Sequence, residues 1–246
     1  MANTITFKPK QVTKKITSNL QDRANDVIIN RFGLNSDAER KTLEEIGEKY
    51  NITRERVRQI EESALNSIKK SDVYKQEAAV FEELKQLIHS LGSIVAEHEL
   101  LPHISKDKSI QNHVHFYLVL GDAFKKHRED NHFHTRWSVD DELAQKVHDS
   151  LKKLLSSLGD EDLVQETEMI KKFFDNMKDV AEQYKNEEIA KRWLSISKTI
   201  SKNPLGEWGK SSSPNVRTRG VKDYAFLVMR KHGSPMHFRE VADQIT

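Results

Sequence analysis

The stretch TLEEIGEKYNITRERVRQIEESALNSI, from Thr42 to Ile68, decides how the rest of the chain is interpreted. Thr42 and Glu45 have the spacing of a capping box, in which a hydroxyl and a carboxylate satisfy free amides at a helix N-terminus. Tyr50-Asn51-Ile52 then forms a turn, and Thr53 is placed to cap a second helix. The pattern predicts a short helix, a tight turn and a longer helix.

Apolar residues of the second helix recur at spacings of three and four, which predicts a buried stripe of Val57, Ile60, Ala64 and Ile68. Gly47 lowers the stability of the first helix compared with alanine. We interpret it as the place where the second helix crosses closely. Together the two helices form a helix-turn-helix, the outline of a motif that binds DNA.

Polar side chains lie off this stripe in the first two turns of the second helix: Arg54, Glu55, Arg58 and Gln59. Arg donates two bonds to guanine, Gln pairs with adenine and Glu accepts from cytosine. We assign Arg56 to a phosphate contact, which fixes the register without reading sequence. With the capping residues Thr42 and Thr53, these residues form the predicted DNA-binding set. The alternative is a charged helix face that is only solvated.

Residues 20 to about 70 resemble region 4, the promoter-recognition end, of the sigma factors of bacterial RNA polymerase. The resemblance rests on Arg23, Val27, the run Arg31-Phe32-Gly33-Leu34 and the run from Ile52 to Glu61. It covers about a fifth of the chain. It implies that Arg54, Glu55, Arg58 and Gln59 contact the −35 promoter element. It also implies that the upstream helix helps to grip a flap of RNA polymerase, so the expected partners are duplex promoter DNA and the polymerase core.

Upstream of this motif, the pattern predicts an amphipathic helix over residues 19–32, with Gly33 as its C-cap and Leu34 packing back across the last turn. Residues 1–15 are polar and basic, and we expect a flexible tail there. A complete sigma factor needs a preceding domain that captures melted DNA, and only 19 residues precede Leu20. We therefore expect an accessory or divergent sigma-like factor, or a fragment of a longer one.

Several small modules are expected, and the fold class is mainly α, with a helix-turn-helix and a winged-helix unit that carries a short β-hairpin. The winged-helix reading rests on a helix over residues 72–90, a short helix stopped by Pro102, a third helix at VHFYLVL and two strands around a turn at residues 128–131. The VHFYLVL run also fits a strand. The predicted divisions are a basic flexible tail (1–15), the sigma-like helix-turn-helix (16–71), the winged-helix module (72–140), a helical module (141–200), a Gly/Ser/Pro-rich linker (201–218) and a partial HARE-type module (219–246).

The last division resembles the opening of the HARE-type helix-turn-helix, known from the delta subunit of bacterial RNA polymerase. The matching residues are Tyr224-Ala225, Leu227-Val228, Gly233, Pro235-Met236 and the run from His237 to Glu240. That module is normally more than twice as long as residues 219–246. We expect it to be truncated or vestigial here.

Charge is segregated along the 246 residues, of which 36% are hydrophobic and 32% charged. Residues 1–71 carry a net charge of +4, residues 72–190 carry −9, and residues 191–239 carry +9. This order favours two ends that face nucleic acid and a middle that contacts protein or acts as a spacer. There is no cysteine, no apolar run long enough to span a bilayer and no signal-peptide core, so we predict a cytoplasmic location and no membrane contact.

Catalytic motifs are missing: there is no phosphate-cradling glycine loop and no nucleophile triad. We predict that the protein is not an enzyme and that it has no catalytic residue, cofactor or small-molecule substrate. Five histidines crowd residues 113–134, where two His-x-His pairs on strands would suit zinc and the alternative is a set of half-exposed polar positions; we predict no metal. Trp208 either stacks on nucleic acid or anchors its loop.

Two further functions remain open. One is a DNA-binding regulator that acts independently of polymerase through tandem helix-turn-helix units. The other is a protein-interaction scaffold, which the acidic middle supports.

Overall fold

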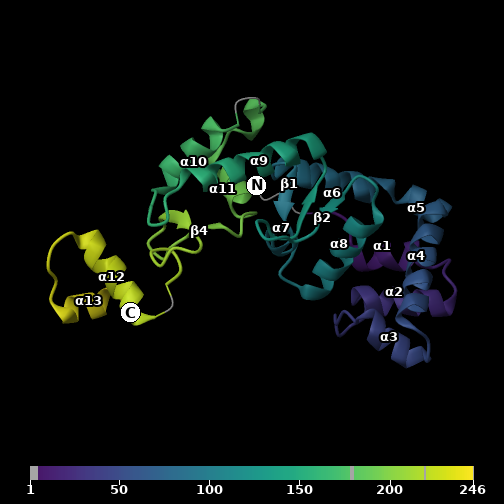
Figure 1. The fold of residues 1–246 in the computed structure, drawn as a ribbon. Coiled ribbons are helices and arrows are strands. Elements are labelled where there is room, and N and C mark those ends of the chain that lie inside the picture. The colour runs from purple at the N-terminus through teal and green to yellow at the C-terminus, as the bar shows by residue number, and fades with distance from the viewer. Residues whose placement is uncertain (1–4, 178–179, 219, 246) are drawn as a thin grey trace. The chain divides into compact units, whose positions relative to one another are not determined.

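The computed structural model describes residues 5–177, 180–218 and 220–245, and the chain is mainly α-helical, as predicted (Figure 1). Its contacts divide it into two compact units. Within the described residues, unit 1 holds 5–127 and 137–139, and unit 2 holds 128–136 and 140–245. None of the described helices combines the length and the apolar character that crossing a bilayer requires.

Six helices open unit 1: α1 (Pro9–Ile16), α2 (Asp22–Phe32), α3 (Leu43–Tyr50), α4 (Arg54–Lys70), α5 (Asp72–Gln76) and α6 (Ala78–Ser90). The predicted flexible tail over residues 1–15 is wrong from Pro9 onward, because α1 buries Val12 and Ile16 in the core; residues 1–4 lie outside the described part. The single helix expected over residues 72–90 is divided at Glu77, so that Tyr74 packs on Phe81 with ring centroids 4.8 Å apart.

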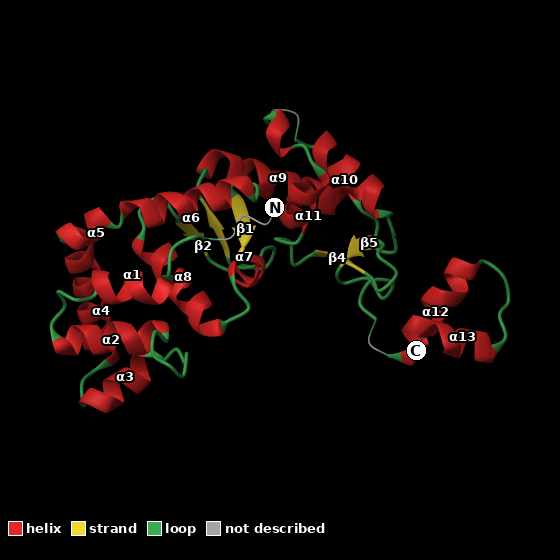
Figure 2. Ribbon diagram, turned by 180° about the vertical axis from the view of Figure 1, so that it is seen from behind, coloured by secondary structure: helices red, strands yellow, loops and turns green. Residues whose placement is uncertain are grey.

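Short strands alternate with helices in the elements that follow: β1 (Ile94–Ala96), α7 (Glu97–Ile104), α8 (Lys108–Leu120), β2 (Lys125–His127) and β3 (Arg136–Ser138), of which Trp137 and Ser138 belong to unit 1. The strands form one sheet in the order β1-β3-β2 (Figure 2). The VHFYLVL run, residues 114–120, lies in α8. It is therefore helical, and the alternative prediction of a strand is wrong. Pro102 does not stop α7, which continues to Ile104, where burial of Leu101 and Ile104 holds its last turn. The helices and the paired strands β2 and β3 on which the winged-helix prediction rests are present, together with the additional strand β1. The winged-helix assignment itself stays a prediction.

Helix α8 is the centre of the unit 1 core. Val114, Phe116, Leu118 and Leu120 are fully buried there and belong to one cluster that also takes in residues of α1, α2, α4 and α6. The Phe32 ring of α2 packs on Phe116, with centroids 5.0 Å apart. The sigma-like segment and the following helices therefore share one hydrophobic core.

Unit 2 contains α9 (Asp141–Ser157), α10 (Glu166–Asp175), the short 3-10 helix η1 (Glu182–Tyr184), α11 (Glu187–Leu194), β4 (Ile200–Lys202), β5 (Trp208–Lys210), α12 (Val221–His232) and α13 (Phe238–Ile245). Within the predicted helical module of residues 141–200, α10 begins only after Val164, which forms an isolated bridge with Trp208. Residues 178–179 lie outside the described part of the chain.

The predicted linker over residues 201–218 contains an antiparallel hairpin instead, with Ser201 opposite Gly209. The Asn203 side chain closes the turn by accepting hydrogen bonds from the Leu205 and Glu207 amides, at 3.0 and 2.9 Å. Trp208 of β5 is only 5% exposed. It therefore anchors the hairpin and is not available to stack on a base.

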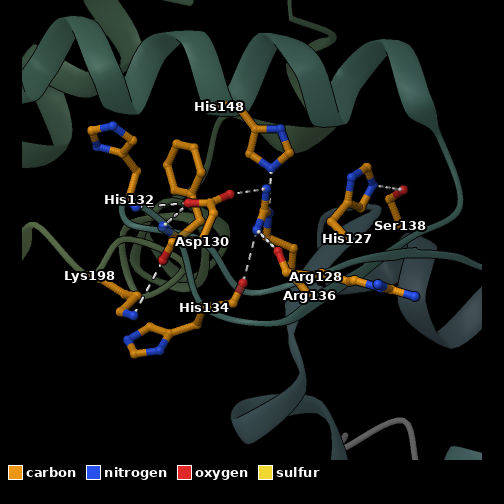
Figure 3. Close-up of polar contacts among 10 residues, drawn as sticks. His127, Arg128, Asp130, His132, His134, Arg136, Ser138, His148 and Lys198 are labelled. Atoms are coloured by element: carbon orange, nitrogen blue, oxygen red, sulfur yellow. Dashed lines mark hydrogen bonds and ion pairs between the residues drawn. The ribbon is translucent and has the colours of Figure 1, made fainter.

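The histidine-rich segment is held by individual hydrogen bonds (Figure 3). Nε of the buried Arg136 donates to Nε2 of His148 at 2.7 Å, and its Nη1 donates to the carbonyls of Arg128 and His134. His127 bonds the Ser138 hydroxyl at 2.8 Å. His113 and His115 lie on helix α8, so this pair does not have the strand geometry that would place both rings on one face for zinc.

Candidate nucleic-acid interface

The helix-turn-helix is built by the local signals that the sequence carries. The Thr42 hydroxyl accepts from the Glu45 amide at 3.2 Å, and the Glu45 carboxylate accepts from the Thr42 amide at 2.6 Å, which completes the capping box. These bonds also lower the pKa of Glu45. At the end of α3, Asn51 adopts a left-handed conformation, with φ of 52°. The Thr53 hydroxyl then accepts from the Arg56 amide and starts α4.

Gly47 allows the turn to close. A β-carbon at this position would lie 2.7 Å from the Ile52 carbonyl oxygen and 3.6 Å from the Arg54 amide. The close approach predicted for Gly47 is therefore present, but the nearest atom belongs to the turn that leads into α4. Since this atom is backbone, a side chain at Gly47 would displace the turn.

A small core of Val27, Ile46 and Val57 joins α2, α3 and α4, and all three side chains are fully buried. Farther along α4, Ala64 and Ile68 enter the larger core of unit 1, and Ile60 is half-buried. The predicted stripe is confirmed as the buried side of α4. It directs the opposite side of the helix to solvent.

The predicted base-reading residues Arg54, Glu55, Arg58 and Gln59 are all exposed in the first two turns of α4, together with Arg56. Nε of Arg58 donates to Glu55 at 3.0 Å, and its Nη1 donates to Glu62 at 3.1 Å. Arg56 donates to the Gln59 amide oxygen at 3.0 Å. The structure thus brings the set to one surface, where these exposed side chains hydrogen-bond one another.

The charges of the arginines on this surface are compensated by ion pairs with nearby glutamates. The hydrogen bonds and charge of Glu55, with the charge of Glu62, raise the pKa of Arg58, and Arg58 in turn lowers the pKa of Glu55. Arg54 pairs with Glu44 of α3 at 3.0 Å. Exposed pairs of this kind contribute little to stability and exchange easily. The arginines are therefore free to exchange these carboxylates for another acceptor.

Three contacts that sequence reasoning missed position these helices. The Asp26 carboxylate of α2 accepts from Lys49 at 2.7 Å and from the Tyr50 hydroxyl at 2.5 Å, which ties α2 to the end of α3. Burial opposes ionisation of Asp26, but these bonds lower its pKa. Arg31 lies 3.4 Å from Glu61 of α4.

The third contact comes from outside the motif. Asn112 of α8 donates to the carbonyls of Gly33 and Ala38, at 3.0 and 2.9 Å, and accepts from Arg40 at 2.8 Å. Its side chain is buried. It fixes the loop that connects α2 to α3. No local pattern in the sequence indicates this contact, which joins residues more than 70 positions apart.

Thr42→Ala is expected to lower the free energy of unfolding by about 1 kcal/mol, because the Glu45 amide loses its side-chain acceptor. Urea titration followed by circular dichroism measures this change. Thr42→Ser keeps the hydroxyl and is the matched control. An equal loss in both variants would show that the capping bond does not contribute.

Comparisons with known proteins agree with this geometry over one part of the chain. Residues 18–70 match the family described as "Sigma-70, region 4", which confirms the first resemblance. The RNA polymerase sigma factor RpoD of Helicobacter pylori is 47% identical over 60 residues, 24% of this chain and 9% of that protein. SigA of Nostoc sp. is 48% identical over 56 residues (23% and 14%), and SigA of Clostridium acetobutylicum is 45% identical over 60 residues (24% and 16%).

The chain therefore spans less than a fifth of the length of these sigma factors. No solved structure matches it. The resemblance of residues 219–246 to a HARE-type module has no support from these matches. What is established is that residues 18–70 are similar to sigma-70 region 4 and fold as a helix-turn-helix.

Proposed function

We propose that the protein binds duplex DNA in a sequence-specific way through the first two turns of α4, recognises a −35-type promoter element and contacts RNA polymerase in transcription initiation. The observation that carries this proposal is the exposed set of Arg54, Glu55, Arg58 and Gln59 on a helix whose opposite side is buried. These are the side-chain types that read base edges in the major groove. The similarity to sigma-70 region 4 supports the promoter as the target.

The pairing on α4 is consistent with base reading. Glu55 holds the Arg58 guanidinium through three hydrogen bonds of 2.8 to 3.2 Å, so both side chains are ordered before DNA arrives. When Arg58 moves to guanine, Glu55 becomes available to accept from a neighbouring cytosine. One exposed pair is thus exchanged for two base contacts.

A polymerase contact is best placed on the outward side of α2. Its opposite side carries Ile28 and Phe32 into the core of unit 1. The outward side presents Asp22 and Arg23, and the Arg23 guanidinium lies 5.0 Å from the centre of the Tyr50 ring. This mixed charged and aromatic surface is suited to a protein partner.

A regulator that works without polymerase is the second candidate. It is favoured by the shared core, because α2 and α4 pack against the following helices of their own unit and the motif does not stand alone. Co-purification with RNA polymerase, combined with footprinting on a promoter that contains a −35 element, distinguishes the two. Protection of the element only in the presence of polymerase supports the first, whereas the same protection without any polymerase association supports the second.

Arg58→Ala is expected to weaken binding to the preferred site by about 1 to 3 kcal/mol and to relax base preference at one position. Competition between duplexes that differ at single base pairs measures both effects. Arg56→Ala is the matched control, because a lost phosphate contact weakens binding to every sequence equally and reduces the salt slope by about 1. A uniform loss for Arg58→Ala would reassign Arg58 to phosphate.

A further inference from the structure

A depression of about 630 Å³ lies beside the β4–β5 hairpin, entirely within unit 2. Its lining combines basic and hydroxyl or amide side chains and contains no carboxylate. The lining residues are His134, Ser197, Lys198, Ser201, Lys202, Asn203, Pro204, Ser211, Val216, Arg217 and Thr218. The depression belongs to the part of the chain that carries a net charge of +9 over residues 191–239.

Three cationic side chains surround the depression. Lys198 donates to Glu129 at 2.7 Å. It also donates to the carbonyl of Asp130 at 3.3 Å, the bond drawn in Figure 3. Lys202 pairs with Glu166. These pairs are partly exposed, and such pairs are exchanged readily for a stronger anion.

Arg217 differs from the two lysines. It is exposed, and no ion pair or side-chain hydrogen bond holds its guanidinium among the residues that the structure describes. A guanidinium presents a planar fork of donors that matches two oxygens of a phosphate. Arg217 is thus the side chain best prepared to receive an anion.

Hydroxyl groups complete the donor set. Ser211 donates to the Ser201 oxygen at 3.0 Å, so the Ser201 hydrogen remains for another acceptor. Thr218 adds a second hydroxyl at the lining. Asn203 does not add a free donor. Its side-chain oxygen closes the hairpin turn by accepting from two backbone amides, which fixes this part of the lining.

We propose that this depression binds a phosphate group of the DNA backbone, as a second DNA contact separate from α4, with Arg217 as the principal ligand and Lys198 and Lys202 in support. The ligand class follows from cationic and hydroxyl donors without an opposing carboxylate in the lining. DNA is chosen as the source because the inference rests on the proposed DNA-binding function. With Trp208 buried, the contact is to phosphate and not to bases.

The test measures the affinity of the full chain for a 40-base-pair duplex as a function of salt, by fluorescence anisotropy. Arg217→Gln is expected to weaken binding about threefold to tenfold near physiological salt and to reduce the slope of log affinity against log salt by about 0.9, with base preference unchanged. Arg230→Gln, an exposed arginine of α12 outside the depression, is the matched control. Equal losses in the two variants would overturn the proposal, because they would reflect only total charge.

Two additional comparisons distinguish failure of this inference from failure of the proposed function. If the Arg58→Ala protein still shows the Arg217 effect, the depression acts independently of base reading and is supported. If the unmodified chain binds its preferred site through Arg58 while Arg217→Gln changes nothing, this inference fails and the proposed function stands. If the chain binds no duplex at all, the proposed function fails as well.

Inorganic phosphate, titrated at constant ionic strength and followed by the tryptophan fluorescence change that Trp208→Phe removes, distinguishes the source of the ligand. Trp208 reports on the site because Lys202 lies 5.1 Å from the centre of its ring. Binding of free phosphate that depends on Arg217, together with duplex affinity that does not, would identify a small phosphate compound as the ligand and overturn the DNA assignment.

Discussion

Acidification from pH 7 to about pH 4.5 is expected to destabilise unit 1 by about 5 kcal/mol, because two histidines of α8 are buried as neutral rings. Burial lowers the pKa of His113 to about 4, and the charge of Lys10 acts in the same direction. Burial also lowers the pKa of His115 to about 3, with Arg40 and Lys126 adding to the effect. Both rings belong to the helix at the centre of the core.

The sign follows from proton binding in the two states. In the unfolded chain both histidines titrate near pH 6.5. Below that value the unfolded state binds more protons than the folded state, so the free energy of unfolding decreases as the pH falls. At pH 4.5 each histidine contributes a loss of about 2 to 3 kcal/mol, and the sum reaches the lower end of the stability of a typical domain.

The contacts of His115 agree with a neutral ring. The Lys126 ammonium lies 3.4 Å from Nε2 and has only hydrogens to donate, so Nε2 acts as the acceptor. The Glu97 carboxylate is 3.6 Å from the same nitrogen and favours protonation. Burial and the surrounding cations outweigh this single carboxylate, because Lys126 itself lies 3.6 Å from Glu97 and compensates its charge.

Urea unfolding at a series of pH values tests this expectation. Carboxylates also titrate in this range, so the informative quantity is the difference between variants. His115→Phe is expected to lose about 2 to 3 kcal/mol less than the unmodified protein between pH 7 and pH 4.5. His89→Asn, at an exposed position of α6, is the control. Parallel curves for the unmodified protein and His115→Phe would contradict the buried neutral state.

The helix-turn-helix was predictable because its signals are local. The capping pair of Thr42 and Glu45, the glycine at 47 and the period of Val57 and Ala64 each act within a few residues, and the structure contains all of them. The exposure of the polar set on α4 follows directly from that period. The ion pairs of Arg58 follow the i,i+3 and i,i+4 spacing of Glu55 and Glu62 on a helix. The pair between Arg54 and Glu44 joins two helices, so no local spacing predicts it.

Two elements that depend on contacts with distant residues are not predicted from the sequence: helix α1 and the β4–β5 hairpin. Helix α1 has the composition of a basic tail, and it is ordered because the Thr13 hydroxyl bonds both His113 and Tyr117, about 100 residues away. The β4–β5 hairpin resembles a linker in composition, and it is ordered by the burial of Trp208. In both places a tertiary contact outweighs local propensity.

Asn112→Ala is expected to destabilise unit 1 by about 3 to 5 kcal/mol and to weaken the proposed DNA binding, although Asn112 lies on α8, outside the helix-turn-helix. The substitution leaves the carbonyls of Gly33 and Ala38 without their donor and Arg40 without its acceptor. Each buried polar group left unsatisfied costs about 1 to 3 kcal/mol. Part of this cost is recovered where water reaches the exposed Arg40.

DNA binding is affected because the loop held by Asn112 determines where α3 begins. Within this loop the Lys41 amide donates to the Asn30 carbonyl at 2.9 Å, and Arg31 donates to the Lys41 carbonyl at 3.2 Å. When the loop is released, α3 loses its fixed position against α4. The exposed residues of α4 remain present, but the helix that supports them is no longer held.

Gln111→Ala is the matched control, because Gln111 is the neighbouring amide side chain on α8 and, among the described residues, donates only to the nearby Ser105 carbonyl. Urea unfolding and duplex affinity are measured on both variants at pH 7, where His113 and His115 are neutral. A large loss of both stability and affinity in Asn112→Ala, with little change in Gln111→Ala, would show that the motif depends on the module that follows it. Affinity that survives in a destabilised Asn112→Ala protein would instead show that α2, α3 and α4 keep their arrangement through the small core of Val27, Ile46 and Val57 alone.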